Sequence, residues 1–449
     1  MSTLVVSPAL RPLVGSVPVP SDKSVGHRAL LFGAIADGVT HIEGFVPGGD
    51  NLSTANALRA MGIDITIEGS HAIVKGVGLF GLRAPAASLD CGNSGTTMRL
   101  LSGLLAAQNF KSTLHGDESL SRRPMMRVLG PLRSRGAIVD GTPHPTKAGE
   151  VTAPLHIGPL ADDSVLQAIE YESPVASAQV KSALLLSGLY AHGVTFVREP
   201  HVSRDHTERM LFAMGAPLKT MGTMVSLDPA GWNGKLHAQN LVVPGDISAA
   251  AFLLVAAQLV AGSRVTVRHV GTNPTRTGIL EIMRDMQAGI HVEAKGDVGG
   301  EPVAEVHLHQ TPTLVAGRIG GETVTRAIDE VPIACALAAR ASGTTRIRDA
   351  AELRVKESDR LATMAQVLRQ FGVQCEEFPD GLDIEGTDAP LRAAEVHSHG
   401  DHRIAMTAAV MGLIADGPTR IRDAECIMTS FPKFVGTLRA LGAEVAVEE

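Results

Sequence analysis

Short segments of this sequence place lysine and arginine beside carboxylates and hydroxyls. The densest segment runs from Arg354 to Arg360 with the sequence RVKESDR, and a shorter one is Asp401-His-Arg403. Lysine and arginine bind phosphate and carboxylate groups through charge-assisted hydrogen bonds, and neighbouring carboxylates can transfer protons. These residue types predict acid–base chemistry on an anionic substrate.

Three acidic residues are candidates for the proton transfer. Asp329 and Glu330 come directly before an apolar helical stretch, and Glu357 follows Lys356. Carboxylates flanked by cations suit the roles of general base and general acid, because nearby charges shift their pKa values. The same pattern is also typical of structural ion pairs, so the residues alone leave both interpretations open.

Most of the cationic groups lie where a helix is expected to begin. Lys23 and Arg28 follow a Ser-Asp pair that reads as a helix cap, and Ser177, Gln179 and Lys181 open another expected helix. A cation near a helix N-terminus opposes the helix dipole at a cost of about 0.3–1 kcal/mol. Helix N-termini bind anions through backbone N–H groups. We therefore expect anion-binding sites at several helix starts.

The helices and strands that must position these residues follow a pattern that recurs six times. In each copy an apolar helix runs into a glycine and then a strand, as in LRAMGIDITI and TLRALGAEVAV, and successive glycines lie 70 to 83 residues apart. We expect each glycine to be a left-handed helix cap. The glycines are Gly62, Gly136, Gly215, Gly289, Gly372 and Gly442. A unit of this length is too long for a common solenoid repeat and predicts a subdomain that is used six times.

Composition limits the class of protein. A chain of 449 residues exceeds the size at which one core stops growing, so we expect two domains of three units each. A net charge of −7 and an aromatic content of 3% argue against a nucleic-acid surface. No segment approaches a membrane span, and the N-terminus lacks the pattern of a signal peptide. We expect a soluble cytoplasmic protein with neither nucleic acid nor a membrane as partner.

Metal binding is not expected from the sequence. The four cysteines are widely separated and form no Cys-x-x-Cys pair. His397, His399 and His402 are close in sequence, but they lack a clear fourth ligand.

The chain resembles the 5-enolpyruvylshikimate-3-phosphate synthase family over essentially its whole length. The resemblance rests on eight segments in order: SDKSVGHRAL, LDCGNSGTTMRL, SLSRRPM, SPVASAQVKSALLLSGL, RDHTERML, AIDEVPI, LRVKESDRL and DHRIAM. The RDHTE and LRVKESDR segments indicate one branch of the family. The resemblance implies an α/β fold of two domains, each with three βαβαββ units around parallel helices, and an active site in the interdomain cleft. It implies one domain formed by residues 1–20 and 243–449 and another formed by residues 21–242.

The resemblance also implies a reaction. The family transfers the carboxyvinyl group of phosphoenolpyruvate to the 5-hydroxyl of shikimate 3-phosphate by addition–elimination, with release of phosphate. This is a step of the shikimate pathway towards chorismate and the aromatic amino acids. The implied partners are these two small molecules, without a metal or an organic cofactor, and we expect a monomer.

The resemblance implies roles for individual residues. The residues implied to bind shikimate 3-phosphate are Lys23, Ser24, Arg28, Ser177, Ala178, Gln179, Arg204, Asp329 and Lys356. Those implied to bind phosphoenolpyruvate are Lys23, Gly95, Arg123, Gln179, Arg360 and Arg403. The implied catalytic residues are Asp329, which takes the proton of the 5-hydroxyl, and Glu357, which with Lys23 protonates the vinyl methylene.

Some positions distinguish branches of the family. Glu352 and Thr429 stand where one branch has Asn and Lys, so we expect those two contacts to be absent or replaced. Some members of this chain's branch have Ala at the position of Gly95 and resist glyphosate, a mimic of phosphoenolpyruvate. The glycine predicts that this chain is sensitive.

Two alternative functions fit the residues less well. The sister enolpyruvyl transferase that acts on UDP-N-acetylglucosamine requires a catalytic Cys on a mobile loop and a Lys-Asn pair, whereas here Lys23 is followed by Ser24. A non-catalytic anion-binding scaffold would need neither Asp329 nor Glu357, and both are present.

Overall fold

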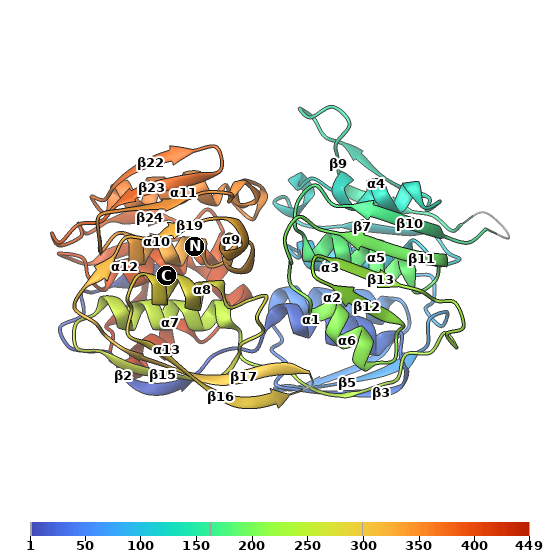
Figure 1. The fold of residues 1–449 in the computed structure, drawn as a ribbon, viewed down its shortest axis with the longest axis horizontal. Coiled ribbons are helices and arrows are strands. Elements are labelled where there is room, and N and C mark those ends of the chain that lie inside the picture. Colours follow the sequence, from blue (N-terminus) through green and yellow to red (C-terminus); the bar gives the residue numbers. More distant parts are fainter. Residues whose placement is uncertain (1, 161–163, 299, 449) are drawn as a thin grey trace. The chain divides into compact units, whose positions relative to one another are not determined.

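The computed structural model describes residues 2–160, 164–298 and 300–448. The chain separates into two compact units (Figure 1). Unit 1 contains Met1–Asp22, Pro244–Asp297 and Glu301–Glu449, and unit 2 contains Lys23–Val243 and Val298–Gly300. Apart from the short segment Val298–Gly300, the chain therefore passes between the units after Asp22 and after Val243.

Six four-stranded sheets of the described part of the chain share the same strand order. In one of them β14 (Asn240–Val242) pairs parallel with β3 (Asp37–Glu43), β3 pairs antiparallel with β5 (His71–Val77), and β5 pairs antiparallel with β4 (Asp64–Glu68). The sixfold repeat of helix and strand predicted from the sequence is confirmed by this recurrence.

The other five sheets divide between the units. In unit 2 one of these sheets has the strand order β6 (Leu89–Asp90), β7 (Ser112–His115), β9 (Val151–Ile157) and β8 (Val139–Pro143). The other has the order β10 (Gln167–Glu172), β11 (His192–Arg198), β13 (Met224–Leu227) and β12 (Leu218–Met221). In unit 1 they are β16 (Ile290–Val298), β17 (Glu301–His309), β15 (Arg264–Gly271) and β2 (Val14–Pro18); β19 (Arg318–Ile319), β21 (Thr344–Ile347), β23 (Gly381–Glu385) and β22 (Gln374–Phe378); and β24 (Glu395–His397), β25 (Thr419–Arg422), β1 (Thr3–Val6) and β26 (Val445–Glu448). A two-stranded ladder joins β18 (Leu314–Val315) to β20 (Ala341–Ser342).

Each unit contains three inner helices that are buried on almost all sides. In unit 2 they are α1 (Lys23–Ala34), α3 (Gly95–Leu105) and α5 (Ala178–Gly188), and in unit 1 they are α7 (Ile247–Leu259), α10 (Val331–Ala338) and α12 (His402–Gly412). Helix α3 contacts both α1 and α5, while α7, α10 and α12 contact one another. A helix that is apolar all round must be buried, which explains why these stretches are rich in Ala, Leu and Gly.

The remaining helices each have both buried and exposed residues. They are α2 (Gly49–Ala60), α4 (Met126–Ser134), α6 (His206–Ala213), α8 (Gly278–Asp285), α9 (Gly321–Ala327), α11 (Arg360–Gln370) and α13 (Phe434–Leu441), with 3-10 turns at Leu120–Arg122, Ala351–Val355 and Ala424–Thr429. On α8, for example, Ile279, Leu280, Ile282 and Met283 are buried. Each unit has its own hydrophobic core, in which a fully buried Leu or Phe contributes about 1.5–3 kcal/mol.

The predicted glycine caps are confirmed in five copies and wrong in one. Gly62 and Gly442, for example, have φ angles of 91° and 109°. In the fourth copy the left-handed residue is Gln287, with φ 65°, and Gly289 does not have a positive φ. A Cβ at Gly289 would lie 1.8 Å from the carbonyl oxygen of His309. This glycine is therefore needed for close approach to β17, not for a cap.

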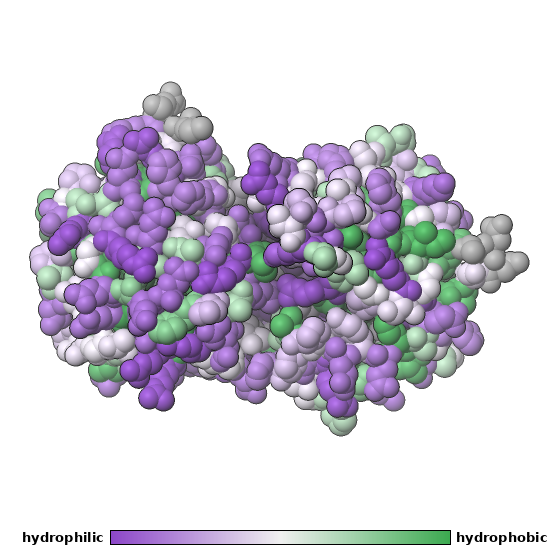
Figure 2. Space-filling model, turned by 90° about the horizontal axis from the view of Figure 1, so that it is seen from above, coloured by the Kyte–Doolittle hydropathy of each residue, from purple (hydrophilic) through white to green (hydrophobic). Residues whose placement is uncertain are grey.

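Hydrophilic side chains predominate on the face drawn in Figure 2, and hydrophobic ones appear there singly or in small groups. In the described residues, every helix is too short or too polar to cross a membrane.

Candidate active site

The candidate site residues of unit 1 gather around one guanidinium group, that of Arg360. Its Nη1 lies 3.1 Å from Asp329 Oδ1, its Nη2 donates to Glu357 Oε2 at 2.6 Å, and its Nε donates to Asp401 Oδ2 at 2.8 Å. The predicted acids Asp329 and Glu357 therefore share one cation, as expected for carboxylates that face the same space.

Three helix starts bring these groups together. Arg360 is the first residue of α11, whose N-cap Asp359 accepts a hydrogen bond from Ala362 N–H. Asp401 caps α12 by accepting from Arg403 N–H, and Asp329 lies just before α10. Helix α10 contacts both α11 and α12, so the three helix starts that carry the cluster belong to neighbouring helices.

Lys356 and Arg403 approach Asp329 as well. Lys356 Nζ lies 3.9 Å from Asp329 Oδ1 and donates to Glu352 Oε1 at 3.2 Å. Arg403 Nη1 donates to the carbonyl oxygen of Asp329 at 3.0 Å, and its Nη2 lies 3.9 Å from Oδ2. Glu352, which stands where one branch of the family has Asn, is thus the acceptor of a hydrogen bond from Lys356.

Electrostatics keep the centre of this cluster ionised. Burial alone would lower the pKa of Arg360, but Asp401, Glu357 and Asp329 together raise it above its ordinary value. Burial would likewise raise the pKa of Asp401, which is fully buried, yet the Arg360 guanidinium lowers it below the ordinary value. Arg360 is a fixed cation, while the side chains of Asp329 and Glu357 remain 14% and 21% exposed to solvent.

In unit 2, Arg28 is held by hydroxyl and backbone oxygens. Its Nε donates to Thr207 Oγ1 at 2.7 Å, its Nη2 donates to Ser182 Oγ at 2.9 Å, and its Nη1 donates to Ser24 O at 3.0 Å. The acceptors come from α1, α5 and α6, so three helices fix this guanidinium.

A second group of unit 2 surrounds Gly95, the first residue of α3. Arg99 Nη1 donates to Gln179 Oε1 at 2.8 Å, and Gln179 Nε2 donates to Thr96 Oγ1 at 2.9 Å. A Cβ at Gly95 would lie 2.6 Å from Arg99 Nη1 and 3.2 Å from Arg123 Nη1. The structure thus brings together three of the residues predicted to bind phosphoenolpyruvate, namely Gly95, Arg123 and Gln179.

Arg123 is 7% exposed, and its contacts are neutral. Its Nη2 donates to Asn93 Oδ1 at 2.7 Å and lies 3.4 Å from Ser119 Oγ. Within the described ranges its Nε is buried without a hydrogen-bond partner. A buried cation with neutral partners retains a strong field for an incoming anion.

The other predicted residues of unit 2 lie at the starts of α1 and α5. Lys23 Nζ donates to Asp50 Oδ2 at 2.8 Å. Ser177 is the N-cap of α5 and is followed by Ala178, while Arg204 lies shortly before α6.

Two cations singled out in the sequence, Lys181 and Arg354, are held in ion pairs. Lys181 is buried inside unit 2 between Glu199 and Glu208, because it lies one helical turn after Ser177 on the face that points inward. Arg354 pairs with Asp359 and Glu377.

The sequence did not predict several residues that lie at the site. Arg99 lies four positions after Gly95 on the same helix face, a spacing that could have identified it. Asp50 and Asn93 contact Lys23 and Arg123 from distant segments, and no local pattern indicates them.

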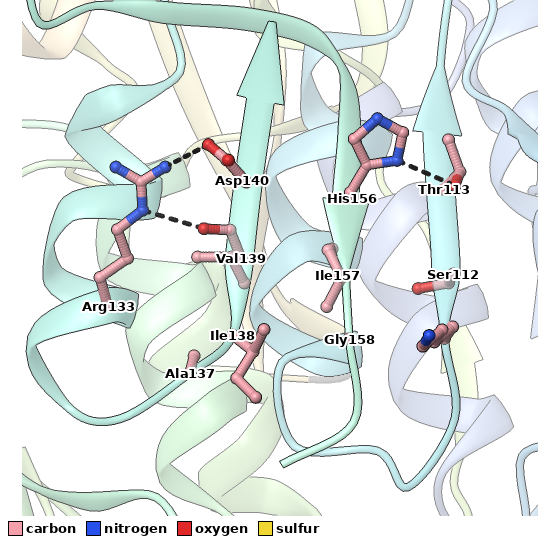
Figure 3. Close-up of a pocket in the computed structure, with 11 residues that line it drawn as sticks. Ser112, Thr113, Arg133, Ala137, Ile138, Val139, Asp140, His156, Ile157 and Gly158 are labelled. Atoms are coloured by element: carbon pink, nitrogen blue, oxygen red, sulfur yellow. Dashed lines mark hydrogen bonds and ion pairs between the residues drawn. The ribbon is translucent and has the colours of Figure 1, made fainter. Parts of the chain in front are cut away.

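A separate surface pocket of about 750 Å³ lies in unit 2 beside α4 and the strands β7, β8 and β9. Figure 3 shows Arg133 at one side, where it donates to Asp140 Oδ1 at 2.7 Å and to Val139 O at 2.9 Å. The residues that line this pocket include none of the predicted site residues, so it is not part of the candidate site.

Comparison with known proteins identifies relatives over the whole chain. The model of the family described as EPSP synthase (3-phosphoshikimate 1-carboxyvinyltransferase) matches residues 9–438. A 3-phosphoshikimate 1-carboxyvinyltransferase of Geobacter sp. (strain M21) is 51% identical over 438 residues, which are 98% of this chain and 99% of the relative. One of Synechococcus sp. (strain RCC307) is 51% identical over 437 residues, covering 96% and 97%. A solved EPSP synthase from Acinetobacter baumannii has 44% identity and a TM-score of 0.86, with both chains fully covered.

Proposed function

Because the chain belongs to the EPSP synthase family of 3-phosphoshikimate 1-carboxyvinyltransferases, we propose that it performs that family's reaction with the two clusters described above. The carboxyvinyl group of phosphoenolpyruvate passes to the 5-hydroxyl of shikimate 3-phosphate, and inorganic phosphate leaves. The observation that carries the assignment of the chemistry is the shared contact of Asp329 and Glu357 with Arg360.

Substrate binding in this proposal follows the charges. Shikimate 3-phosphate is held by Lys23, Ser24, Arg28, Ser177, Ala178, Gln179 and Arg204 of unit 2, and its hydroxyls contact Asp329 and Lys356 of unit 1. Phosphoenolpyruvate is bound by Lys23, Gly95, Arg123, Gln179, Arg360 and Arg403. Guanidinium groups suit its phosphate and carboxylate because each can donate two parallel hydrogen bonds.

The proposed chemistry has an addition and an elimination step. Asp329 accepts the proton of the 5-hydroxyl while that oxygen bonds to C2 of phosphoenolpyruvate, and Glu357, with Lys23, delivers a proton to the C3 methylene. In the tetrahedral intermediate, C3 then returns a proton, the C2–O bond to phosphate breaks, and the enol double bond re-forms. Arg360 contacts both carboxyl groups and so orients them.

The test is phosphate release from phosphoenolpyruvate with each of two acceptors. We expect release with shikimate 3-phosphate and none with UDP-N-acetylglucosamine. Release with the nucleotide sugar alone, or with neither acceptor, would contradict the proposal. The monomeric state and the cytoplasmic location stay predictions. Mass photometry checks the first, and cell fractionation checks the second.

A further inference from the structure

We propose that Glu199 and Lys181 are positioning residues for shikimate 3-phosphate: they fix the two chain segments that carry Ser177 and Arg204. This inference rests on the proposed function, because it assigns these segments to the phosphate end of that substrate. Neither side chain contacts the substrate in the proposal.

The two residues form a buried ionic group with Glu208. Lys181 Nζ lies 2.8 Å from Glu199 Oε2 and 2.8 Å from Glu208 Oε1, and it donates to the carbonyl oxygen of Ser203 at 3.4 Å. The side chains of Lys181, Glu199 and Glu208 are 5%, 2% and 6% exposed. Lys181 lies in α5, Glu208 lies in α6, and Glu199 follows β11, so the group joins three elements of unit 2.

Glu199 is the member that reaches the segments of the site. Its Oε1 accepts a hydrogen bond from Ser177 N–H at 2.7 Å. Its two oxygens also accept from the Ser203 hydroxyl at 2.8 and 2.7 Å, and Oε2 accepts from Ser203 N–H at 3.4 Å. Ser177 directly precedes Ala178 and Gln179, and Ser203 directly precedes Arg204. One carboxylate therefore fixes the main chain at both places.

The same segment also supplies a partner of Arg28. Thr207 lies between Ser203 and Glu208, and its hydroxyl accepts from Arg28 Nε at 2.7 Å. A shift of this segment would move Arg28 and Arg204 together. Phosphate recognition depends on donors held to within about 0.5 Å of the productive geometry, so such a shift would weaken binding.

Stability alone does not explain a buried group with one cation and two carboxylates. Apolar side chains of the same volume usually stabilise a core as well as a buried ion pair does. A carboxylate is needed, however, where several N–H and O–H donors from separate segments must be held by one side chain. The hydrogen bonds of Glu199 match this need, and those of Glu208 do not extend to the site segments.

The test compares two matched variants of the full chain, Glu199→Gln and Glu208→Gln. Each removes one negative charge at 2.8 Å from Lys181 Nζ in a nearly fully buried position, but only Glu199 also binds Ser177 and Ser203. We expect both variants to lower the melting temperature. We expect Glu199→Gln alone to raise the dissociation constant of shikimate 3-phosphate, measured by calorimetry, by about tenfold, because a hydrogen bond to a charged group is lost.

Steady-state kinetics separate positioning from general damage. In Glu199→Gln the KM for shikimate 3-phosphate should rise with its dissociation constant, while the KM for phosphoenolpyruvate, measured at saturating shikimate 3-phosphate, should change by less than about twofold. Equal rises in both variants, or an unchanged dissociation constant in Glu199→Gln, would overturn the inference.

A third variant covers the case in which Glu199→Gln does not fold. Ser203→Ala removes only the hydroxyl that donates to Glu199, and we expect it to raise the dissociation constant by about threefold; no change would overturn the inference. Failure of the unaltered protein to bind shikimate 3-phosphate would be a different result, since it contradicts the proposed function itself.

Discussion

The two clusters of candidate residues differ in how their arginines are compensated. In unit 1 Arg360 contacts three carboxylates, those of Asp329, Glu357 and Asp401. In unit 2 the hydrogen bonds of Arg123 go to an amide and a hydroxyl oxygen. The charge of Arg360 is therefore balanced by carboxylates, whereas the hydrogen-bond partners of Arg123 are neutral. In the proposed mechanism unit 1 therefore supplies the two carboxylates for proton transfer together with Arg360 and Arg403, and unit 2 supplies an anion-binding arginine that has neutral partners.

The largest expected effect is on turnover through the acids of unit 1. We expect Asp329→Asn or Glu357→Gln to lower kcat by about 10²–10⁴, because each removes a general acid or base. Rates of phosphate release at saturating substrates provide the measurement. Glu377→Gln is the control, since it removes a carboxylate of unit 1 that pairs with Arg354. Near-normal turnover in both site variants would contradict the proposed roles of Asp329 and Glu357 in proton transfer.

The next largest effect is on binding through unit 2. We expect Arg123→Gln to raise the KM for phosphoenolpyruvate by about 10–100-fold, because charge-assisted hydrogen bonds to the anion are lost. The neighbouring Arg122→Gln is a matched control, because that side chain is 75% exposed and pairs with Glu118. The comparison between units would fail if Arg123→Gln lowered kcat strongly and left this KM unchanged.

Arg403 contacts both the backbone and the carboxylate of Asp329. Its replacement should therefore change both kcat and the KM for phosphoenolpyruvate.

How much of this could be predicted from the sequence depends on the range of each interaction. The sixfold pattern and the grouping of Asp329 with Glu357 were predictable because helix caps and helix starts are local signals. The buried position of Lys181 was not, because its partners Glu199 and Glu208 lie 18 and 27 residues further along the chain. Gly289 was misread for a related reason: the contact that requires a glycine comes from another strand.

A smaller effect concerns glyphosate. Gly95→Ala would place a Cβ 2.6 Å from Arg99 Nη1 and 3.2 Å from Arg123 Nη1, so the ends of these two side chains must shift. We expect the inhibition constant for glyphosate to rise by about tenfold or more, because the same guanidinium groups would bind the inhibitor. Gly130→Ala is the control, since its Cβ would meet only Met126 at 3.8 Å. An unchanged inhibition constant in Gly95→Ala would count against the placement of the anion beside Gly95.

The smallest effect is on the pH dependence of stability, and it has opposite signs in the two units. The pKa of Asp401 lies below its ordinary value of 3.8, because the Arg360 guanidinium outweighs burial, so its contribution to stability is present above that pH and is lost as pH falls. Burial raises the pKa of Glu208 above 4.5 in spite of Lys181, so its contribution is present below that pH and is lost as pH rises. Melting temperatures measured between about pH 3 and pH 7 should therefore fall less steeply towards acid in Asp401→Asn than in the unaltered protein, and more steeply in Glu208→Gln. If both variants changed the slope in the same direction, the two buried carboxylates would not differ in the way that their partners predict.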